Sequence, residues 1–259
     1  MEYEHLRCER EGEYVTITLD RPERRNCLST DVLNELHHAF CSTGDISDIS
    51  GIVLASTGPV FSAGHDLAEM VGMTEEELRR LFDVCTLAMT SMAEVPQVVV
   101  ARVQGVATAA GAQLAASADL IVASEDAAFS TPGGKGGLFC HTPMVAVARQ
   151  IGRKRAVEFA LTGGEISAAT ALDWGLVNRV VAPDDLESAT LEFLRYATRG
   201  SRYAKGLGKQ TLYAQLEMTT DDAYELAVGV MSRAAASGDG AEWPRAFIEK
   251  RKPEWTHTE

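Results

Sequence analysis

The sequence contains two loops rich in small residues, Phe61-Ser62-Ala63-Gly64-His65-Asp66-Leu67 and Gln104-Gly105-Val106-Ala107-Thr108-Ala109-Ala110-Gly111-Ala112-Gln113. Each loop can present backbone N–H groups without obstruction by a side chain, and together they could hold a carbonyl oxygen on which negative charge develops. Such donors stabilise charge that appears only in the transition state, by about 2.7–4 kcal/mol per donor. The second loop ends at Gln113, where acid–base chemistry would need a carboxylate.

Composition and charge limit the class of protein. The chain has 259 residues, with 37 acidic and 24 basic side chains and a formal net charge of -13. This acidic balance argues against general affinity for nucleic acids or anionic membranes. No apolar run approaches the roughly 20 residues that cross a bilayer. We therefore expect neither a nucleic-acid partner nor a membrane partner.

The five cysteines are an odd number and show no C-x-x-C spacing. The charged N-terminal stretch has no apolar segment of the secretory type. These features predict reduced thiols, no metal site and a cytoplasmic location.

Strand and helix signals alternate through most of the chain and then give way to helices. Apolar, β-rich runs predict strands, and apolar residues at helical spacing predict helices. The predicted strands are 14–19, 51–56, 97–103, 119–123, 128–131 and 176–181. The predicted helices are 29–41, 74–94, 112–117 and one that begins with Thr142 as N-cap and Pro143 as its first residue. Thr74 and Glu77 fit a capping box. The order of elements predicts an α/β core over residues 1–197 and a helical region over 198–259.

The order and spacing of these motifs resemble the crotonase superfamily, the enoyl-CoA hydratase/isomerase family, along almost the whole chain. Besides the two loops, the matching stretches are 20–26, 118–123, 161–163, 171–177 and 247–251. Stretches 64–67, 109–113, 131–133 and 137–140 resemble the subgroup of enoyl-CoA hydratase domain-containing protein 3. The resemblance implies an α/β fold, a crotonase-like spiral of ββα repeats with a helical C-terminal trimerisation region.

The resemblance also implies acyl-CoA thioesters as ligands, with coenzyme A as part of the substrate and no separate cofactor. It implies a homotrimer or a dimer of trimers. The oxyanion-hole N–H groups fall on His65 and Ala110. The implied substrate- and CoA-binding positions are Arg24, Arg25, Ala63, His65, Asp66, Leu67, Ala68, Phe247 and Lys250. Ala68 departs from hydratases that carry a lysine there, which weakens the expected phosphate contacts.

The usual acid–base pair of the family is missing. In its hydratases two glutamates share the work, and their positions fall here on Gln113 and Gly133. Neither residue can exchange a proton near neutral pH, and the loss of a positioned acid–base group costs about 10²–10⁴ in rate. His141 matches the place of an aspartate in dienoyl-CoA isomerases of the family, so it is either an acid–base residue or simply a helix-entry residue. Gln113 either orients a water or the thioester oxygen, or is a buried, hydrogen-bonded amide.

Three functions remain open at this point. The first is an enzyme of fatty-acid or related acyl-CoA metabolism, a hydratase, isomerase or lyase that acts through a stabilised enolate. The second is a non-catalytic acyl-CoA binder or regulatory subunit. The third is an acyl-CoA thioesterase that uses Cys140 or a water activated by His141.

Overall fold

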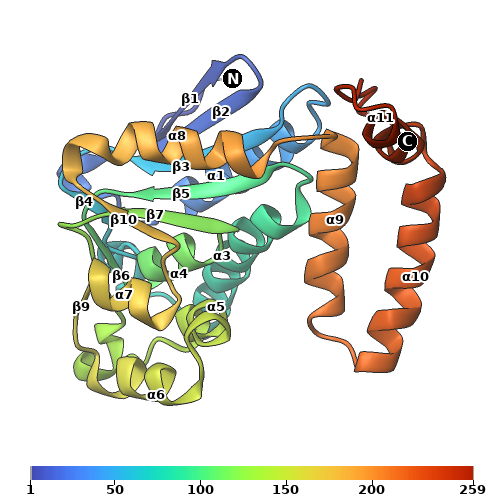
Figure 1. Ribbon diagram of the computed structural model, residues 1–259. Helices are drawn as coiled ribbons and strands as arrows, with labels where there is room; N and C mark the ends of the chain where they lie inside the picture. Colours follow the sequence, from blue (N-terminus) through green and yellow to red (C-terminus); the bar gives the residue numbers. More distant parts are fainter. Residues whose placement is uncertain (1, 259) are drawn as a thin grey trace.

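The computed structural model describes residues 2–258, and its larger sheet has six strands in the order β1-β2-β3-β5-β7-β10 (Figure 1). β1 and β2 form an antiparallel hairpin, and the other neighbouring strands are parallel. The strands are β1 (Leu6–Glu11), β2 (Tyr14–Leu19), β3 (Gly51–Ser56), β5 (Val98–Val103), β7 (Leu120–Ser124) and β10 (Arg179–Val181). The sequence does not predict β1, because three of the four residues that follow Arg7 are charged, namely Glu9, Arg10 and Glu11. Its pairing with β2 outweighs this weak local signal.

A smaller sheet in the order β4-β6-β8-β9 carries the two loops. β4 (Val60–Ser62), β6 (Val106–Thr108) and β8 (Ala128–Ser130) are parallel, and β9 (Ile166–Ser167) pairs antiparallel with β8. Each of the three parallel strands follows a strand of the larger sheet and leads into a helical segment. This succession is the ββα repeat implied by the resemblance. The last two residues of β4 and all of β6 lie within the stretches predicted as loops, so only part of each stretch is irregular.

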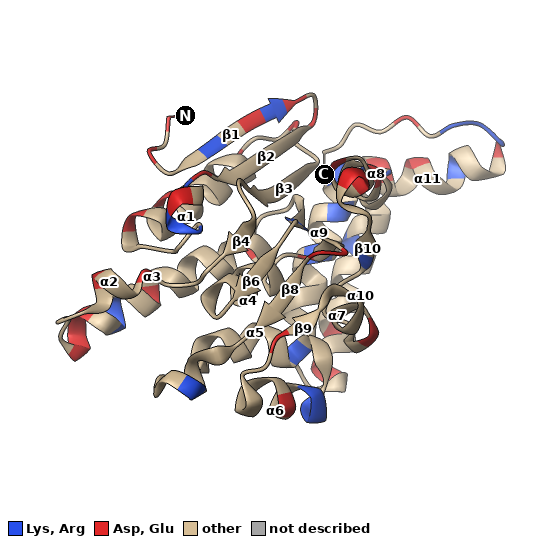
Figure 2. Ribbon diagram, turned by 90° about the vertical axis from the view of Figure 1, so that its left-hand side faces the viewer, with Lys and Arg blue, Asp and Glu red and all other residues tan. Residues whose placement is uncertain are grey.

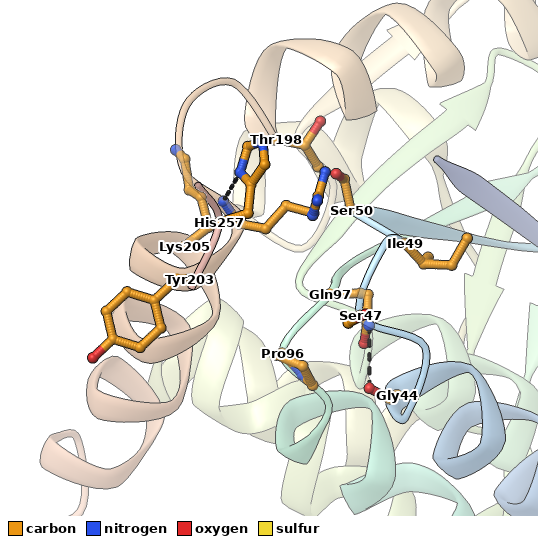
Figure 3. Close-up of a pocket in the computed structure, with 11 residues that line it drawn as sticks. Gly44, Ser47, Ile49, Ser50, Pro96, Gln97, Thr198, Tyr203, Lys205 and His257 are labelled. Carbon is orange, nitrogen blue, oxygen red and sulfur yellow. Dashed lines mark hydrogen bonds between the residues drawn. The ribbon is translucent and has the colours of Figure 1, made fainter. Parts of the chain in front are cut away.

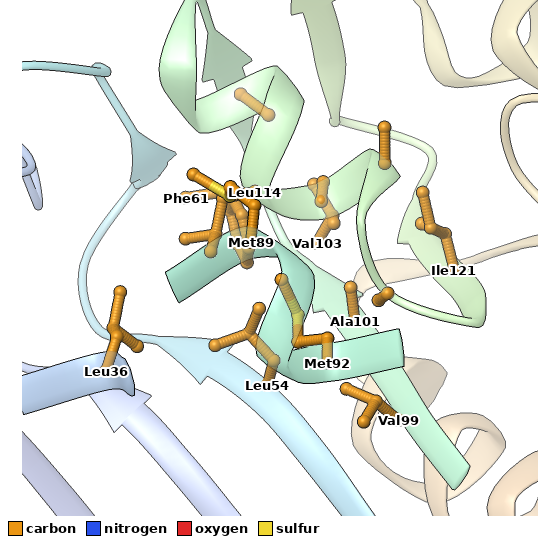
Figure 4. Close-up of a cluster of buried hydrophobic side chains, with 14 of the residues drawn as sticks. Leu36, Leu54, Phe61, Met89, Met92, Val99, Ala101, Val103, Leu114 and Ile121 are labelled. Carbon is orange, nitrogen blue, oxygen red and sulfur yellow. The ribbon is translucent and has the colours of Figure 1, made fainter. Parts of the chain in front are cut away.

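Helices cover both faces of the larger sheet, which explains why its central strands are apolar on both sides. Ile52 and Leu54 of β3 face the main core, whereas Val53 and Ala55 face α8 (Leu186–Ala197). The main core lies between the sheet and helices that include α1 (Thr30–Gly44), α3 (Glu75–Glu94) and α4 (Ala110–Ala116). Figure 4 shows the methionines of α3 and Leu114 of α4 among the strand side chains.

The structure confirms one helix boundary and corrects another. α3 has the capping box: the Thr74 N–H donates to Glu77 Oε2 at 2.7 Å, and the Glu77 N–H donates to Thr74 Oγ1 at 3.3 Å. The helix predicted to begin at Thr142-Pro143 is α5 (His141–Ile151), and the prediction of Thr142 as its N-cap is wrong. Pro143 is the third helical residue. An N–H there has no acceptor within the helix, so proline is tolerated and does not mark the first position.

The remaining helices follow β8. They are α6 (Arg153–Thr162), α7 (Ala168–Trp174), α9 (Arg202–Gln215), α10 (Thr220–Ala236) and α11 (Gly238–Ile248), with the four-residue α2 (Leu67–Met70) earlier in the chain and short 3₁₀ segments at Pro22–Arg24, Pro132–Gly136 and Pro183–Asp185. Among the described residues, no helix combines the length and apolar character needed to span a membrane.

α9, α10 and α11 stand beside the core rather than within it (Figure 1). α9 contacts α3 and β5, whereas α10 contacts α9 and α11. Large apolar side chains are exposed along these helices, namely Leu212, Leu216, Tyr224, Val228, Met231, Trp243, Phe247 and Ile248. Exposed faces of this kind favour packing against another chain. The homotrimer, and the boundary between an α/β core (residues 1–197) and a helical region (198–259), stay predictions.

A buried ion pair anchors α9 to the core. Lys209 Nζ lies 2.7 Å from Asp119 Oδ2, and the two side chains are only 8% and 13% exposed. Asp119 also accepts the Val99 N–H at 2.7 Å and the Tyr213 hydroxyl at 2.8 Å. The sequence indicates only that Asp119 ties down a turn. In the structure its carboxylate joins β5, the start of β7 and α9.

We expect Lys209→Met to lower the free energy of unfolding by about 3–5 kcal/mol, because the Asp119 carboxylate would stay buried without its counter-charge. Urea unfolding followed by circular dichroism measures this change. Lys205→Met, on an exposed position of the same helix, is the matched control and should change stability by no more than about 0.5 kcal/mol. Equal unfolding curves for Lys209→Met and the wild type would contradict the anchoring role.

Candidate active site

The first loop is held against the segment that precedes α1. The Leu28 N–H donates to the Gly64 carbonyl at 2.8 Å, and the Asp66 N–H donates to the Leu28 carbonyl at 3.2 Å. The Ala63 N–H is bonded to the Arg25 carbonyl at 3.0 Å. The His65 N–H lies between these bonded groups and has no acceptor among residues 2–258. This N–H is therefore available to a ligand.

The second loop presents an N–H group at the start of α4. Ala110 is the first residue of this helix, and the N–H of a first helical residue has no acceptor within the helix. Ala109, just before it, has a φ of 52°, a left-handed conformation that is costly for a residue with a side chain. This backbone conformation turns the chain from β6 into α4 and leaves the Ala110 N–H at the turn.

Two glycines bring the loops into contact. Gly64 has a φ of 82°, and a Cβ atom on it would lie 2.9 Å from the Thr108 carbonyl oxygen and 3.0 Å from the Ala110 nitrogen. A Cβ on Gly111 would lie 2.2 Å from the Ser62 carbonyl oxygen. Neither position has room for a side chain. The free N–H groups of His65 and Ala110 therefore come from two backbone segments that touch.

The His65 side chain is half-buried, and both of its ring nitrogens are shielded from solvent. Its ring lies edge-on to Phe82, with 5.4 Å between ring centroids. Neither ring nitrogen has a hydrogen-bond partner in the described part of the chain. Burial lowers the pKa of the imidazole, against smaller opposing effects of the Leu28 backbone and the Glu69 charge. The ring is therefore neutral at neutral pH.

Asp66 is committed to contacts within the protein. Its carboxylate lies 2.7 Å from Arg24 Nη2, accepts the Cys27 thiol at 3.4 Å, and caps α2 by accepting the Ala68 N–H at 3.1 Å. Burial alone would raise the pKa of this carboxyl, but the hydrogen bonds from Arg24, Cys27 and Ala68 together lower it. Asp66 thus positions Arg24 and α2 beside the first loop.

The rim of this loop is exposed. Leu67 is 69% exposed, and Ala68, Arg24 and Arg25 are exposed as well. The strands and the helix behind the loops, β4, β6, β8 and α4, carry no charged side chain (Figure 2). The arginines therefore supply the positive charge next to the loops.

A cavity of about 300 Å³ opens one helical turn beyond Ala110, at Gln113. Residues three apart lie on the same face of a helix, so Gln113 lies on the same face of α4 as Ala110. The Gln113 side chain is 5% exposed, and its Oε1 has no hydrogen-bond partner among the described residues. The other lining residues come from α3, α4, α5 and α9; they are Thr86, Met89, Thr90, Ala93, Ala116, Ser117, Thr142, Val145, Ala146, Arg149, Gln150 and Tyr213.

The cavity lining offers no group suited to proton transfer near neutral pH. Arg149 stays protonated. Burial raises the pKa of the Tyr213 phenol, and the Asp119 carboxylate raises it further, so the phenol also stays protonated. Gln113 can only donate and accept hydrogen bonds. The cavity can therefore hold and orient a ligand, while an acid–base step would need a group from elsewhere.

The structure does not bring His141 into this cavity. His141 is the exposed first residue of α5, and its ring lies 5.0 Å from that of Phe139. The adjacent Thr142 lines the cavity instead. Cys140 is buried, and burial raises the pKa of its thiol, which disfavours the nucleophilic thiolate.

The two positions that the resemblance matches to the hydratase glutamates, Gln113 and Gly133, have different surroundings in the structure. Gln113 opens on the cavity, whereas Gly133 has no free space. A Cβ on Gly133 would lie 2.1 Å from the Leu138 carbonyl oxygen and 2.8 Å from Cys140 Sγ. The Leu138 N–H donates back to the Gly133 carbonyl at 3.0 Å, which closes the loop over this position.

Phe247 and Lys250 lie apart from the loops within one chain. Phe247 belongs to α11 and is 71% exposed, and Lys250 follows the same helix. α11 contacts α9 and α10. In Figure 1, α11 lies on the side of α9 that faces away from β4 and β6, the strands that carry the loops. The structure therefore brings together Arg24, residues 63–68, Ala110 and Gln113, but neither Phe247 nor Lys250.

The sequence did not predict the cavity residues that lie on helices other than α4. Tyr213, Arg149 and Met89 lie on three helices far apart in the chain. Their local patterns are those of ordinary amphipathic helices, so no short-range signal marks them as cavity residues. Among residues 2–258, no group of three or more His, Cys, Asp or Glu side chains is placed to hold a metal ion, and all five cysteines are free.

The fold and these loops define the class of the protein. The chain matches the enoyl-CoA hydratase/isomerase family over residues 9–258 and belongs to this family, the crotonase superfamily, whose members process acyl-CoA compounds. Within it, the chain is 42% identical over 252 residues to enoyl-CoA hydratase domain-containing protein 3, mitochondrial, from Danio rerio, covering 97% of this chain and 87% of that protein. These matches confirm the predicted superfamily and subgroup.

Solved structures agree with this assignment. An enoyl-CoA hydratase from Mycobacterium smegmatis superposes with a TM-score of 0.95 at 41% identity, covering 98% of this chain and 99% of that chain. The human enoyl-CoA hydratase domain-containing protein 3 superposes with a TM-score of 0.91 at 40% identity, covering 97% and 100%. The predicted α/β crotonase fold with a helical C-terminal region is confirmed.

The predicted cytoplasmic location is wrong. The relatives from Danio rerio, Mus musculus and Homo sapiens are named as mitochondrial proteins. Charge and cysteine count describe the folded chain and its redox state, whereas a compartment is selected by targeting signals that the import machinery reads. Composition therefore could not distinguish these compartments.

Proposed function

We propose that the protein binds an acyl-CoA thioester with the carbonyl oxygen between the N–H groups of His65 and Ala110. One observation carries the proposal: these two N–H groups lie on touching loops and lack acceptors among the described residues. Two donors aimed at one oxygen stabilise the charge that develops there when the thioester forms an enolate. The acyl group would then extend towards Gln113 and its cavity.

Coenzyme A enters this proposal as part of the substrate, with no other cofactor. The loop backbone of residues 63–68 and the exposed Arg24 and Arg25 would face the CoA moiety. Phe247 and Lys250 lie too far along the chain's own C-terminal helices to serve the same site, so they would reach the nucleotide end of CoA bound to another copy. A homotrimer or a dimer of trimers supplies such a copy.

The reaction we favour is enolate chemistry without the two-glutamate hydration step, such as isomerisation or a related lyase reaction. Gln113 would orient the acyl group or a water, because its amide cannot transfer a proton. A thioesterase reaction is less well supported, since the Cys140 thiol is buried with a raised pKa and His141 lies outside the cavity lining. The neutral His65 ring, whose nitrogens have no hydrogen-bond partner among the described residues, belongs to the residue that supplies one of the two free N–H groups.

The second candidate is a non-catalytic acyl-CoA binder or regulatory subunit. It is favoured by one specific observation, the lack of an acid–base group in the cavity lining. Binding and turnover separate the two candidates, because the binder requires the same thioester contacts without any chemistry.

We expect a carbonyl-labelled butyryl-CoA to bind more tightly than CoA, with its thioester C=O stretch moved to lower wavenumber by the two donors. Calorimetry and difference infrared spectroscopy measure the two effects. Crotonyl-CoA, a 3-enoyl-CoA and a dienoyl-CoA then test for turnover, and release of free CoA tests for hydrolysis. Binding with an unshifted carbonyl stretch would contradict the proposed oxyanion hole, and turnover on any of the three would exclude the non-catalytic candidate.

A further inference from the structure

A second cavity, of about 170 Å³, lies on the side of the molecule where α9 begins (Figure 3). The end of α1, the segments leading into β3 and β5, the start of α9 and the C-terminal tail form its walls. Its lining includes Gln97, Arg202, Lys205 and His257. No residue of the two small-residue loops lines it. Its volume is several times that of a water molecule and below the usual range of about 300–1,000 Å³ for drug-sized ligands, so it suits a small ion or molecule.

Two polar groups at this cavity are buried without partners, Gln97 Oε1 and Arg202 Nε. Gln97 is only 3% exposed. Its Nε2 lies 3.3 Å from the carbonyl oxygens of Thr43 and Gly44, which fixes the orientation of the amide and makes the other atom an acceptor. Buried groups of this kind are nearly always satisfied, by protein, water or a ligand. A ligand that satisfies both atoms must accept from Arg202 and donate to Gln97.

The charges around the cavity favour an anion. Within residues 2–258, the Arg202 guanidinium forms no ion pair and no side-chain hydrogen bond, although the chain has a net charge of -13. The Asp48 carboxylate interacts electrostatically with Arg202, but it already forms an ion pair with Arg10 at 2.7 Å. Lys205 adds a second positive side chain to the lining. A half-buried guanidinium without a carboxylate partner suits an oxyanion.

The C-terminal tail supplies a further donor. The Arg202 N–H donates to His257 Nδ1 at 3.2 Å, which leaves Nε2 as the ring nitrogen that donates. Asp239 fixes the tail by accepting the N–H groups of Thr256 and His257 at 2.7 and 3.0 Å, and it does not line the cavity. Figure 3 shows His257 across the cavity from Gln97.

We propose that this cavity binds a small oxyanion that also carries a hydroxyl group, of which hydrogen phosphate and a 2-hydroxycarboxylate are the two sources. The anionic oxygens accept from Arg202 and His257, and the hydroxyl group donates to Gln97 Oε1. The bound ion joins the α1–β3 loop, α9 and the tail, and therefore couples ligand binding to the docking of the C-terminal helices. This site is independent of the thioester site proposed above.

Two matched pairs of anions test the ligand class. At pH 8, hydrogen phosphate and sulfate have the same charge, but only the former carries a hydroxyl; glycolate and acetate form the same comparison among carboxylates. Calorimetry at constant ionic strength should give saturable binding of hydrogen phosphate or glycolate, about ten-fold tighter than its partner without a hydroxyl. The anion that binds more tightly, hydrogen phosphate or glycolate, identifies the source. Absence of saturable binding, or equal affinity within both pairs, overturns the proposal.

Variants locate the site. Arg202→Gln should weaken binding of the preferred anion about ten-fold, and Lys205→Gln, at an exposed position, should weaken it less. Arg199→Gln is the control, because Arg199 lies over the Tyr196 ring at 4.8 Å and does not line the cavity. If Arg202→Gln is unfolded by circular dichroism, the comparison of Lys205→Gln with Arg199→Gln decides the question. Equal weakening by the control and the cavity variants overturns the proposal.

Discussion

A Gly64→Ala variant is expected to bind acyl-CoA about ten-fold more weakly and to lose about 10²–10³-fold of any turnover on a thioester. The added Cβ would lie 3.0 Å from the Ala110 nitrogen and 2.9 Å from the Thr108 carbonyl oxygen. Neither neighbour is a flexible side chain, so the two loops must move apart. The N–H groups of His65 and Ala110 would then no longer meet at one oxygen. Calorimetry with butyryl-CoA and the infrared shift of the bound thioester carbonyl measure the loss.

Gly72→Ala is a matched control for this variant. Gly72 has a φ of 84°, close to the 82° of Gly64, but a Cβ on it would meet no atom within 4 Å. Both substitutions therefore carry the same backbone strain of about 1–2 kcal/mol, and only Gly64→Ala adds the clash between loops. Weak binding in the Gly64 variant alone supports the oxyanion hole. Wild-type affinity and an unchanged carbonyl shift in Gly64→Ala would contradict it.

The parts of the fold that the sequence predicts are those with strong local signals. α3 begins at the capping box of Thr74 and Glu77 and ends at Glu94, as predicted, and β3 occupies residues 51–56. Here the apolar pattern, the cap and the buried neighbours all favour the same structure. The loops were also found from the sequence, because glycine and alanine mark places where backbones approach closely. The structure adds which atoms approach.

Long-range relations escaped the sequence. Asp119 lies 90 residues before Lys209, and nothing in either local pattern indicates that their side chains meet in the interior. The cavity at Gln113 depends on the packing of four helices, so Tyr213 could not be assigned to it. The resemblance indicated Phe247 and Lys250 as CoA-binding positions. It could not indicate whether they contact the ligand of their own chain or that of another copy. His141 was a candidate by position alone, and the structure leaves it outside the cavity lining.

The structure around Gly133, which the resemblance matches to a hydratase glutamate, shows more than the sequence reveals. A missing side chain alone would leave a space that a water or a substituted residue could fill. Instead, the Leu138 carbonyl oxygen occupies the direction in which a Cβ would point, at 2.1 Å. The backbone has thus closed over one of the two positions, while the other still opens on a cavity. We therefore predict that a carboxyl side chain can be introduced at Gln113 and is obstructed at Gly133.

Gln113→Glu is expected to raise the hydration of crotonyl-CoA about 10²-fold above the wild type, the lower end of what one positioned acid–base group contributes. The new carboxyl would lie one helical turn beyond the Ala110 N–H, in a cavity that already accepts a side chain of this size. Burial raises the pKa of a carboxyl and brings it closer to neutrality, where a general base works best. The rate should rise with pH as this carboxyl loses its proton. Ultraviolet absorbance of the enoyl thioester follows the reaction.

Gln113→Leu controls for the change in shape, and we expect no gain of hydration from it because it adds no titratable group. Adding Gly133→Glu to Gln113→Glu should give no further gain and should lower stability, since the Leu138 carbonyl oxygen and Cys140 Sγ leave no space for its Cβ. A Gln113→Glu variant that binds crotonyl-CoA like the wild type yet hydrates it no faster would mean that the acyl α- and β-carbons lie away from Gln113. A large gain from the double variant would mean instead that the loop from Gly133 to Leu138 opens when substrate binds.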